Sequence, residues 1–276
     1  MTDPKWARAT ERGRYYDDPA GGPPLISVTN ALSSIAKPAL IPWAAGMTAD
    51  AVIAAPIDTA RRARTEPTAL RRELVGVHRQ YTERAQNLGT RVHLRAVSLV
   101  LNTPHPYDEE VEPYAVQLAA WFRLWRVDFE RDVEAVETTV MHRRYGYAGT
   151  GDLWLWLPTG LYRRRQLWLI DYKTSAKKPA DTVYAEQPLQ LAGLRHAPEW
   201  LLPDDTSEPA PRVHRTALLN LRPRAHRFIE VPSGRPQFRA FLSSLRTARY
   251  LHDDAPSAYT TVVPPWAPGA PERKAA

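Results

Sequence analysis

The stretch GDLWLWLPTGLYRRRQLWLIDYKT, residues 151–174, constrains the fold more than any other part of the sequence. Two apolar runs rich in Trp and Leu flank a centre near residues 161 and 162, and the Pro-Thr-Gly before that centre favours a turn. Such runs predict two antiparallel strands joined as a hairpin. In the symmetric register Asp152 and Asp171 are cross-strand neighbours within side-chain reach.

The alternation of side chains along a strand predicts which charges share a face. Asp171 and Lys173 fall on one face of the second strand, and Asp152 falls on the same face of the first strand as Trp154. In the symmetric register these two faces coincide, whereas a slip of one residue would separate them. The residue pattern leaves the loop type open.

Two neighbouring carboxylates at the end of an apolar hairpin repel each other, and each raises the pKa of the other. A hard divalent cation such as Mg²⁺ prefers oxygen ligands and would relieve that repulsion. A lysine two residues beyond the second acid can orient or activate a water beside the metal. This set of groups suits metal-assisted phosphodiester hydrolysis. The alternative is a surface hairpin with an ordinary Asp–Lys ion pair.

The rest of the chain predicts helices first and strands later. A short helix capped by Ser27 or Thr29 ends at Pro38, and a following helix is interrupted at Pro56. Apolar residues recur every three or four positions from Thr68 to about Leu101, which predicts one or two helices. The further segments are a helix over 110–129, strands over 133–142, 147–157 and 164–174, a helix over 182–196, strands over 213–221 and 226–231, and a helix over 236–251.

This order of elements predicts an α/β or α+β fold, with a mixed central sheet flanked by helices and a helical N-terminal lobe. We expect a flexible segment over residues 1–25 and a single domain over residues 26–252. Within that domain the helical lobe would span about 27–130 and the catalytic core about 131–252. The Pro- and Ala-rich tail, residues 253–276, is expected to be disordered.

Composition narrows the function classes. The 276 residues include no cysteine, which excludes disulfides, thiolate zinc sites and iron–sulfur clusters. The net charge of +7 favours a polyanionic partner such as nucleic acid, although it also fits a chain that is merely Arg-rich. The start of the chain lacks a signal-peptide pattern, and prolines and Asp50 interrupt the apolar stretch over 39–56. We therefore expect a cytoplasmic protein without a membrane span, in the host cell if a phage encodes it.

Four short motifs follow one another along the expected helix, strand, strand and helix. They are GTRVH (89–93), GTGD (149–152), DYK (171–173) and QLAGL (190–194). In this order they resemble the PD-(D/E)xK nuclease superfamily, and within it the RecB-like and Cas4-like exonucleases of actinobacterial phages. The resemblance spans about residues 27–251 and implies a restriction-endonuclease-like core.

The resemblance implies roles for the matching residues. Those implied as ligands of Mg²⁺ or Mn²⁺ are His93, Asp152, Asp171, the carbonyl group of Tyr172 and, as a further ligand or a group behind the ligands, Glu137. Lys173 would position the attacking water, and Gln190 would contact the substrate strand or brace the site.

Two departures from the family pattern stand out. Leu194 occupies the position where a tyrosine is expected after Gln190. The four cysteines that hold the iron–sulfur cluster of Cas4 proper are missing, so neither that cluster nor a role in CRISPR adaptation is implied.

The resulting hypothesis is a metal-dependent DNA exonuclease that acts in phage DNA recombination, replication or repair. Its partners would be DNA and, through the closing helix and tail, a recombinase or single-strand-annealing protein. A catalytically silent nucleic-acid-binding or assembly protein that keeps the nuclease fold is the alternative. A small-molecule metal hydrolase is a third hypothesis, which the basic charge and the lack of zinc-type histidine pairs disfavour.

Three arginine clusters are candidates for phosphate contacts: residues 61–64, 71–72 and 163–165. Solvated helix or turn faces explain each cluster equally well. The third cluster lies in the expected turn, away from the end of the hairpin that carries the acids.

Overall fold

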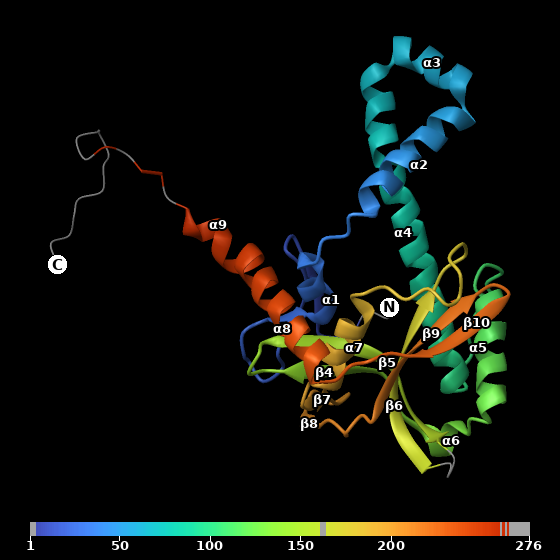
Figure 1. Ribbon diagram of the computed structural model, residues 1–276, viewed down its shortest axis with the longest axis vertical. Helices are drawn as coiled ribbons and strands as arrows, with labels where there is room; N and C mark the ends of the chain where they lie inside the picture. The colour runs from blue at the N-terminus through green and yellow to red at the C-terminus, as the bar shows by residue number, and fades with distance from the viewer. Residues whose placement is uncertain (1–3, 161–163, 260, 263, 265–276) are drawn as a thin grey trace.

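The computed structural model describes residues 4–160, 164–259, 261, 262 and 264 (Figure 1). Its body is a mixed, mostly antiparallel sheet flanked by helices. The central strands are β4 (Val133–His142), β5 (Tyr147–Thr159), β6 (Arg164–Thr174), β9 (Arg215–Arg222) and β10 (Ala225–Glu230). The predicted fold class and these five strands are thereby confirmed, as is the α+β order of elements.

The hairpin of β5 and β6 has the symmetric register. Leu153 pairs with Ile170 and Trp154 with Leu169, so the next pair toward the strand ends is Asp152 with Asp171. The strand β9 then adds to β6 in parallel, which places β6 inside the sheet rather than at its edge.

Helices cover both faces of the sheet. Trp154 and Leu169 pack in a core with α7 (Gln187–Arg195) and α8 (Arg235–Arg249). On the opposite face, Leu153 and Ile170 pack with α5 (Glu112–Trp125) and the second half of α4 (Pro67–Val100). Successive side chains of the hairpin therefore point alternately into two separate apolar layers, as expected for a sheet covered on both sides.

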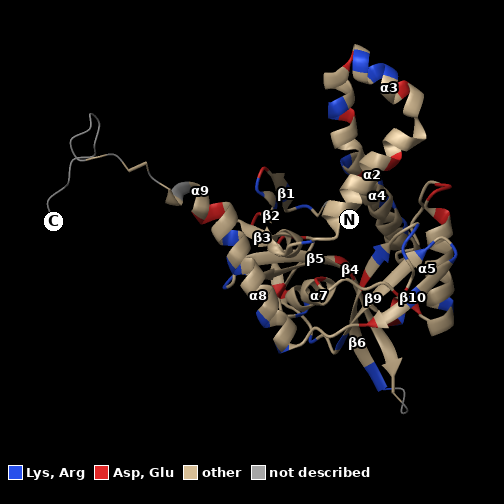
Figure 2. Ribbon diagram, turned by 45° about the horizontal axis from the view of Figure 1, so that its top comes forward, with Lys and Arg blue, Asp and Glu red and all other residues tan. Residues whose placement is uncertain are grey.

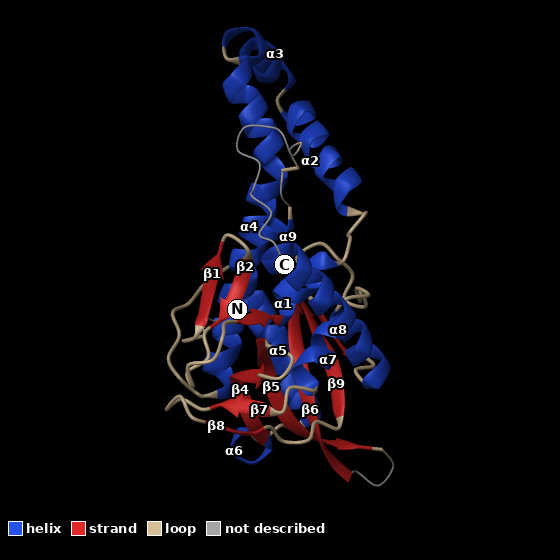
Figure 3. Cartoon of the chain, turned by 90° about the vertical axis from the view of Figure 1, so that its left-hand side faces the viewer, coloured by secondary structure: helices blue, strands red, loops and turns tan. Residues whose placement is uncertain are grey.

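A helical lobe projects from this body (Figures 1 and 3). It consists of α2 (Leu40–Ala54), α3 (Pro56–Thr65) and the first half of α4, which is a single helix of 34 residues. Trp43 of α2 packs edge-on against His78 and Tyr81 of α4. Among the described residues no single helix has the length and apolarity to cross a membrane, and α2 and α3 meet that condition only as a pair bent by 96°.

The expected flexible segment over residues 1–25 is wrong for most of its length. β1 (Ala7–Thr10) and β2 (Gly13–Tyr16) form a hairpin. The next strand, β3 (Leu25–Ser27), pairs with β2 in antiparallel and with β5 in parallel, and so joins the hairpin to the main sheet. Tyr16 and Leu25 are buried against Met141 and Ala148 of the main sheet. These strands are too short to show a clear period in the sequence, and tertiary burial decides their structure.

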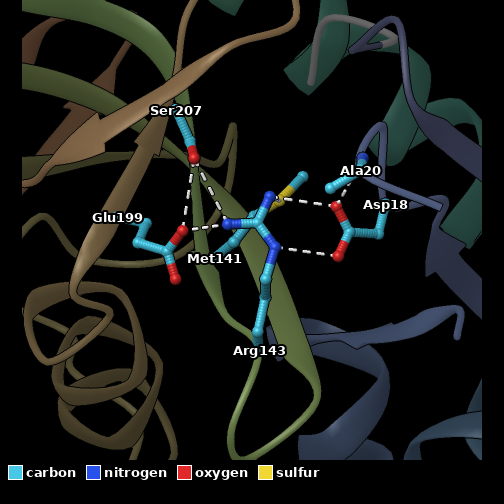
Figure 4. Close-up of polar contacts among 6 residues, drawn as sticks. All are labelled: Asp18, Ala20, Met141, Arg143, Glu199 and Ser207. Carbon is cyan, nitrogen blue, oxygen red and sulfur yellow. Dashed lines mark hydrogen bonds and ion pairs between the residues drawn. The ribbon is translucent and has the colours of Figure 1, made fainter. Parts of the chain in front are cut away.

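An arginine at the end of β4 ties this N-terminal segment to the far edge of the sheet (Figure 4). The guanidinium of Arg143 donates two hydrogen bonds to the Asp18 carboxylate, at 2.8 and 2.9 Å, and also pairs with Glu199. Its hydrogen bonds lower the pKa of the buried Asp18 side chain. Glu199 belongs to β7 (Glu199–Leu201), which pairs with β4 and β8 (Ser207–Pro209). Neither of these short strands was predicted.

Several helix boundaries differ from the prediction. The Ser27 cap is confirmed, since its hydroxyl accepts a hydrogen bond from the Asn30 amide at the start of α1 (Val28–Ala31), and a 3-10 turn (Leu32–Ser34) follows. The helix expected over 110–129 ends at Trp125, because Arg126 adopts a left-handed conformation, and α6 (Phe129–Asp132) follows separately.

The last helices also deviate. α7 begins only at Gln187, and the carbonyl groups of Ala180 and Thr182 before it accept hydrogen bonds from the buried Asn220 side chain. Part of the tail predicted to be disordered is helical: a π-helical turn (Tyr250–Asp254) and α9 (Ala255–Ala258) extend α8. Most of the remaining tail, like Arg163 of the third arginine cluster, lies outside the described residues.

Candidate metal centre

The two acids of the hairpin line a cavity of about 990 Å³. Its floor is the sheet at the ends of β5 and β6, and one wall is the middle of α4. The β1–β2 hairpin and the start of α1 form the other wall, and α7 contributes Gln190 and Leu194. The N-terminal strands that sequence reasoning missed therefore help to enclose this site.

Three side chains from separate elements converge beside the cavity; His93 and Asp152 line it, whereas Glu137 lines a separate hollow. One ligand atom from each of His93, Glu137 and Asp152 lies within 4.8 Å of those of the other two, a group that could hold a metal ion. Nδ1 of His93 is 3.3 Å from Oδ1 of Asp152 and 3.6 Å from Oε1 of Glu137. All three side chains are largely buried, which removes competing water.

Local backbone geometry explains how Glu137 reaches this group. The register of β4 and β5 pairs Val136 with Leu153 and Thr138 with Gly151, so Glu137 lies opposite Asp152. Glu137 has a φ of +46°, a conformation that costs free energy for a side chain other than glycine. This local distortion of β4 accompanies the convergence of the two carboxylates.

The histidine comes from α4, which packs over the end of the sheet. Val92 and Ala96 of that helix are buried in the core, and this anchors the turn that carries His93. The ring of Tyr172 stands edge-on to the imidazole at 5.7 Å between centroids. Gly89, one turn earlier, lets α4 approach β6 closely, since a Cβ there would lie 3.3 Å from Oγ1 of Thr174.

A second group of polar side chains adjoins the first. Nζ of Lys173 lies 2.6 Å from Oδ2 of Asp171 and donates a hydrogen bond to Oε1 of Gln190 at 3.1 Å. Nε2 of Gln190 in turn donates to Oδ1 of Asp171 at 3.0 Å. The backbone amide of Tyr172, which lies between Asp171 and Lys173 in the sequence, donates a hydrogen bond to Oδ2 of Asp152 at 2.6 Å. This bond links the second group to the group of His93, Glu137 and Asp152.

Electrostatics couples these side chains. Burial opposes ionisation of Asp171, and together with the charge of Asp152 it raises the pKa of Asp171 despite the nearby Lys173. Burial also acts to raise the pKa of Asp152, but the charges of His93 and Lys173 lower it overall. Burial lowers the pKa of His93, whereas the charge of Asp152 and the contacts with both acids raise it more, to about 10.

These residues fit a bound cation. Within the described part of the chain, Nδ1 of His93 is buried with no hydrogen-bond partner and faces two carboxylates, which is the arrangement that a metal ligand needs. A cation would also offset the repulsion among the buried acids of this site, one of which, Asp171, is in contact with Lys173.

The structure brings most of the predicted site residues together. His93, Asp152 and Glu137 form one group, while Asp171 lies beside it with its oxygens engaged by Lys173 and Gln190. Gln190 is seen bracing the site, one of its two predicted roles. The ligand roles of Asp171 and the Tyr172 carbonyl group stay predictions.

Sequence reasoning missed the hydroxyl groups behind the site. The Tyr16 hydroxyl lies 3.0 Å from Oγ1 of Thr150, which lies 3.0 Å from Oγ1 of Thr139. Tyr16 and Thr150 both line the cavity, and so does Arg14 of the N-terminal hairpin. No motif marks Arg14 or Tyr16, because only the pairing of β2 with β3 and of β3 with β5 brings them to the site.

No protein-family model matches the chain, and no match was found among curated proteins.

Proposed function

We propose that this protein is a divalent-metal-dependent DNA nuclease of the PD-(D/E)xK type, with a restriction-endonuclease-like core, and that it acts as an exonuclease. One observation carries the proposal: His93, Glu137 and Asp152 converge, and two of them, His93 and Asp152, line the same cavity as Asp171 and Lys173. A nuclease of this type needs acids and a lysine together at the end of a strand hairpin, open to a substrate.

The residues would divide the work as follows. His93, Glu137 and Asp152 would hold Mg²⁺ or Mn²⁺, with Asp171 beside them as a further carboxylate. The bound ion would supply a polarised phosphate group and a more acidic water at neutral pH. The ammonium group of Lys173 would donate a hydrogen bond to the attacking water or to a phosphate oxygen.

Gln190 would keep this geometry in place. Its amide contacts both Asp171 and Lys173, so it would hold the ammonium group and the carboxylate in a fixed position relative to each other. The net charge of +7 supports a polyanionic substrate such as DNA. Leu194 lines the cavity where the family pattern has a tyrosine, so no hydroxyl from that position takes part.

Cleavage of labelled linear DNA tests the proposal. We expect the protein to degrade linear DNA with Mg²⁺ or Mn²⁺, to stop when a chelator is added, and to spare closed-circular DNA. Asp152→Asn and Lys173→Ala should abolish cleavage, whereas Asp50→Asn on the exposed side of α2 should not. If Asp152→Asn cuts DNA like the parent protein, the assignment of the site is wrong.

A measurement that does not depend on activity tests the metal site itself. Mn²⁺ should raise the melting temperature of the parent protein, because a ligand that binds only the folded state stabilises it. His93→Ala should remove that increase. A catalytically silent DNA-binding protein would instead show DNA binding without cleavage under every metal condition.

A further inference from the structure

The helix that supplies His93 also runs the full length of the projecting lobe. α4 is continuous from Pro67 to Val100, so its first half and its metal-site half keep a common helical phase. A helix rises about 1.5 Å and turns about 100° per residue. The position of any side chain on α4 relative to His93 therefore follows from its number.

One face of α4 leads from the lobe to the metal centre. In steps of three or four residues back from His93, this face carries Thr90, Gln86, Thr82, Arg79, Val75, Arg72 and Arg71. All of them lie within about 60° of His93 around the helix axis. Residues 82–93 of this face line the metal-site cavity, and residues 71–79 line a separate groove of about 560 Å³ farther along the helix. We call this the α4 track.

The arginines of the α4 track differ from the other arginines nearby. Arg71, Arg72 and Arg79 are exposed, and no ion pair to them is found within the described part of the chain. Figure 2 shows the basic residues of α3 and α4 in the lobe. Several neighbouring or comparable arginines are held by acids: Arg61 and Arg62 by Asp58, Glu66 and Glu73, and Arg165 by Asp132.

The opposite face of the same helix makes the contrast sharper. Arg84, Arg91 and Arg95 lie on the far side of α4 from His93, and they pair with Asp108, Glu110 and Glu112 next to α5. Those arginines fasten α4 to the body. The three arginines of the track have no such structural task, and a surface with unpaired guanidinium groups suits phosphate.

From this geometry we infer that the backbone of double-stranded DNA binds along the α4 track, with the reacting end of the duplex at the metal centre. The inference rests on the proposed function for what happens at that end. Along the helix axis Arg79 lies about 21 Å and Arg71 about 33 Å from His93. One turn of duplex DNA is about 34 Å, so a strand that passes the metal centre returns to the same line near Arg71.

The straightness of both partners favours duplex over single-stranded DNA. α4 is one uninterrupted helix over this distance, and duplex DNA is straight here because its persistence length is about 50 nm. The complementary strand would cross the same line between the two contacts, within reach of Arg79. The track would thus grip about ten base pairs of the duplex, which corresponds to about 33 Å at 3.4 Å per base pair.

Equilibrium binding of DNA in the presence of a chelator tests the inference without cleavage. The variant is Arg71→Ala/Arg72→Ala/Arg79→Ala, and the matched control is Arg224→Ala/Arg227→Ala/Arg239→Ala, which removes three exposed arginines away from the track. We expect the track variant to bind a 20-base-pair duplex at least about tenfold more weakly than the control at 0.15 M salt. The slope of log K against log salt concentration should fall by about 2.7, or about 0.9 for each lost phosphate contact.

Substrate length provides a second criterion. A hairpin DNA with a stem of six base pairs is too short to reach from the metal centre to Arg71, so track and control variants should bind it more nearly alike. Equal affinity of the two variants for the 20-base-pair duplex overturns the inference. A loss that appears only with single-stranded DNA overturns duplex as the occupant.

These outcomes are independent of the cleavage assay. If the parent protein cuts DNA but the track variant binds duplex like the control, the track inference fails and the proposed function stands. If the parent protein cuts no DNA but its duplex binding depends on the three arginines, the proposed nuclease activity fails and the DNA-binding surface stands.

Discussion

Replacing Gly151 with alanine is expected to destabilise the protein, although alanine is normally preferred to glycine inside a strand. Gly151 precedes Asp152 in β5. A Cβ at this position would lie 2.3 Å from Cη2 of Trp154 and 3.0 Å from Cδ1 of Leu169. Trp154 cannot easily move aside, because its ring is buried and packs edge-on against Trp200 at 5.4 Å between centroids.

The size of the effect follows from two opposing contributions. Alanine gains roughly 0.5–1 kcal/mol over glycine by losing less backbone entropy on folding. Forcing an extra methyl group into a packed core costs roughly 1–3 kcal/mol. The net expectation for Gly151→Ala is a loss of about 1–2 kcal/mol in the free energy of unfolding. Gly76→Ala is the matched control, because nothing lies within 4 Å of a Cβ there and alanine should stabilise α4 by about 0.8–1 kcal/mol.

Urea unfolding followed by far-UV circular dichroism measures both variants. A double-mutant cycle with Trp154→Leu isolates the clash: once the indole ring is removed, Gly151→Ala should become neutral or stabilising, with a coupling energy of about 1–3 kcal/mol. If Gly151→Ala stabilises the protein as much as Gly76→Ala does, the close packing of Trp154 over the strand is not what requires glycine.

Two further predictions concern other buried polar groups. Asp132 has a side chain only 6% exposed, and hydrogen bonds from Arg131, the Asp128 amide and Arg165 lower its pKa from 3.8. A lowered folded-state pKa stabilises the protein above the unfolded value and loses that effect as the pH falls through the folded value. Asp132→Asn should therefore cost about 1–2 kcal/mol at pH 7, since both arginines are partly solvent-screened. As the pH is lowered below about 4, the urea midpoint of Asp132→Asn should fall less than that of the parent protein. If the two proteins lose stability in parallel as the pH falls, the ionised Asp132 side chain does not have this stabilising role. Gln190→Ala should lower the rate of DNA cleavage about 10- to 100-fold, because Asp171 and Lys173 lose the amide that holds them. Single-turnover kinetics measures this rate, and Gln80→Ala, at an exposed position of α4, is the control. An unchanged rate in Gln190→Ala would show that Gln190 has no role in the site.

Much of the candidate site follows from local sequence signals. The two apolar runs predicted the hairpin, and of the registers left open the structure has the symmetric one, which places Asp152 beside Asp171. Pro158 and Thr159, expected in the turn, are paired within β5. The symmetric register is favoured because a slip of one residue would turn every apolar side chain of the hairpin to the wrong layer. The same logic located Lys173 and the helix of Gln190.

The N-terminal strands show where local signals fail. Residues 1–25 are mostly polar and include Gly and Pro, which favoured a flexible segment. Residues 7–16 and 25–27 are ordered because β3 pairs with β5 and because Arg143 binds Asp18 across 125 positions of sequence. Contacts between residues so far apart in the sequence produce no periodic pattern of apolar residues within the segment itself.

The sequence by itself therefore determined the hairpin and the presence of acids and a lysine at its end, because those features depend on residues close together in the chain. Only the tertiary structure decided that Glu137 joins His93 and Asp152, and that Asp171 is shared by Lys173 and Gln190. It also decided which arginines are free to meet phosphate, because an arginine is neutralised or left available by acids that fold next to it from distant segments.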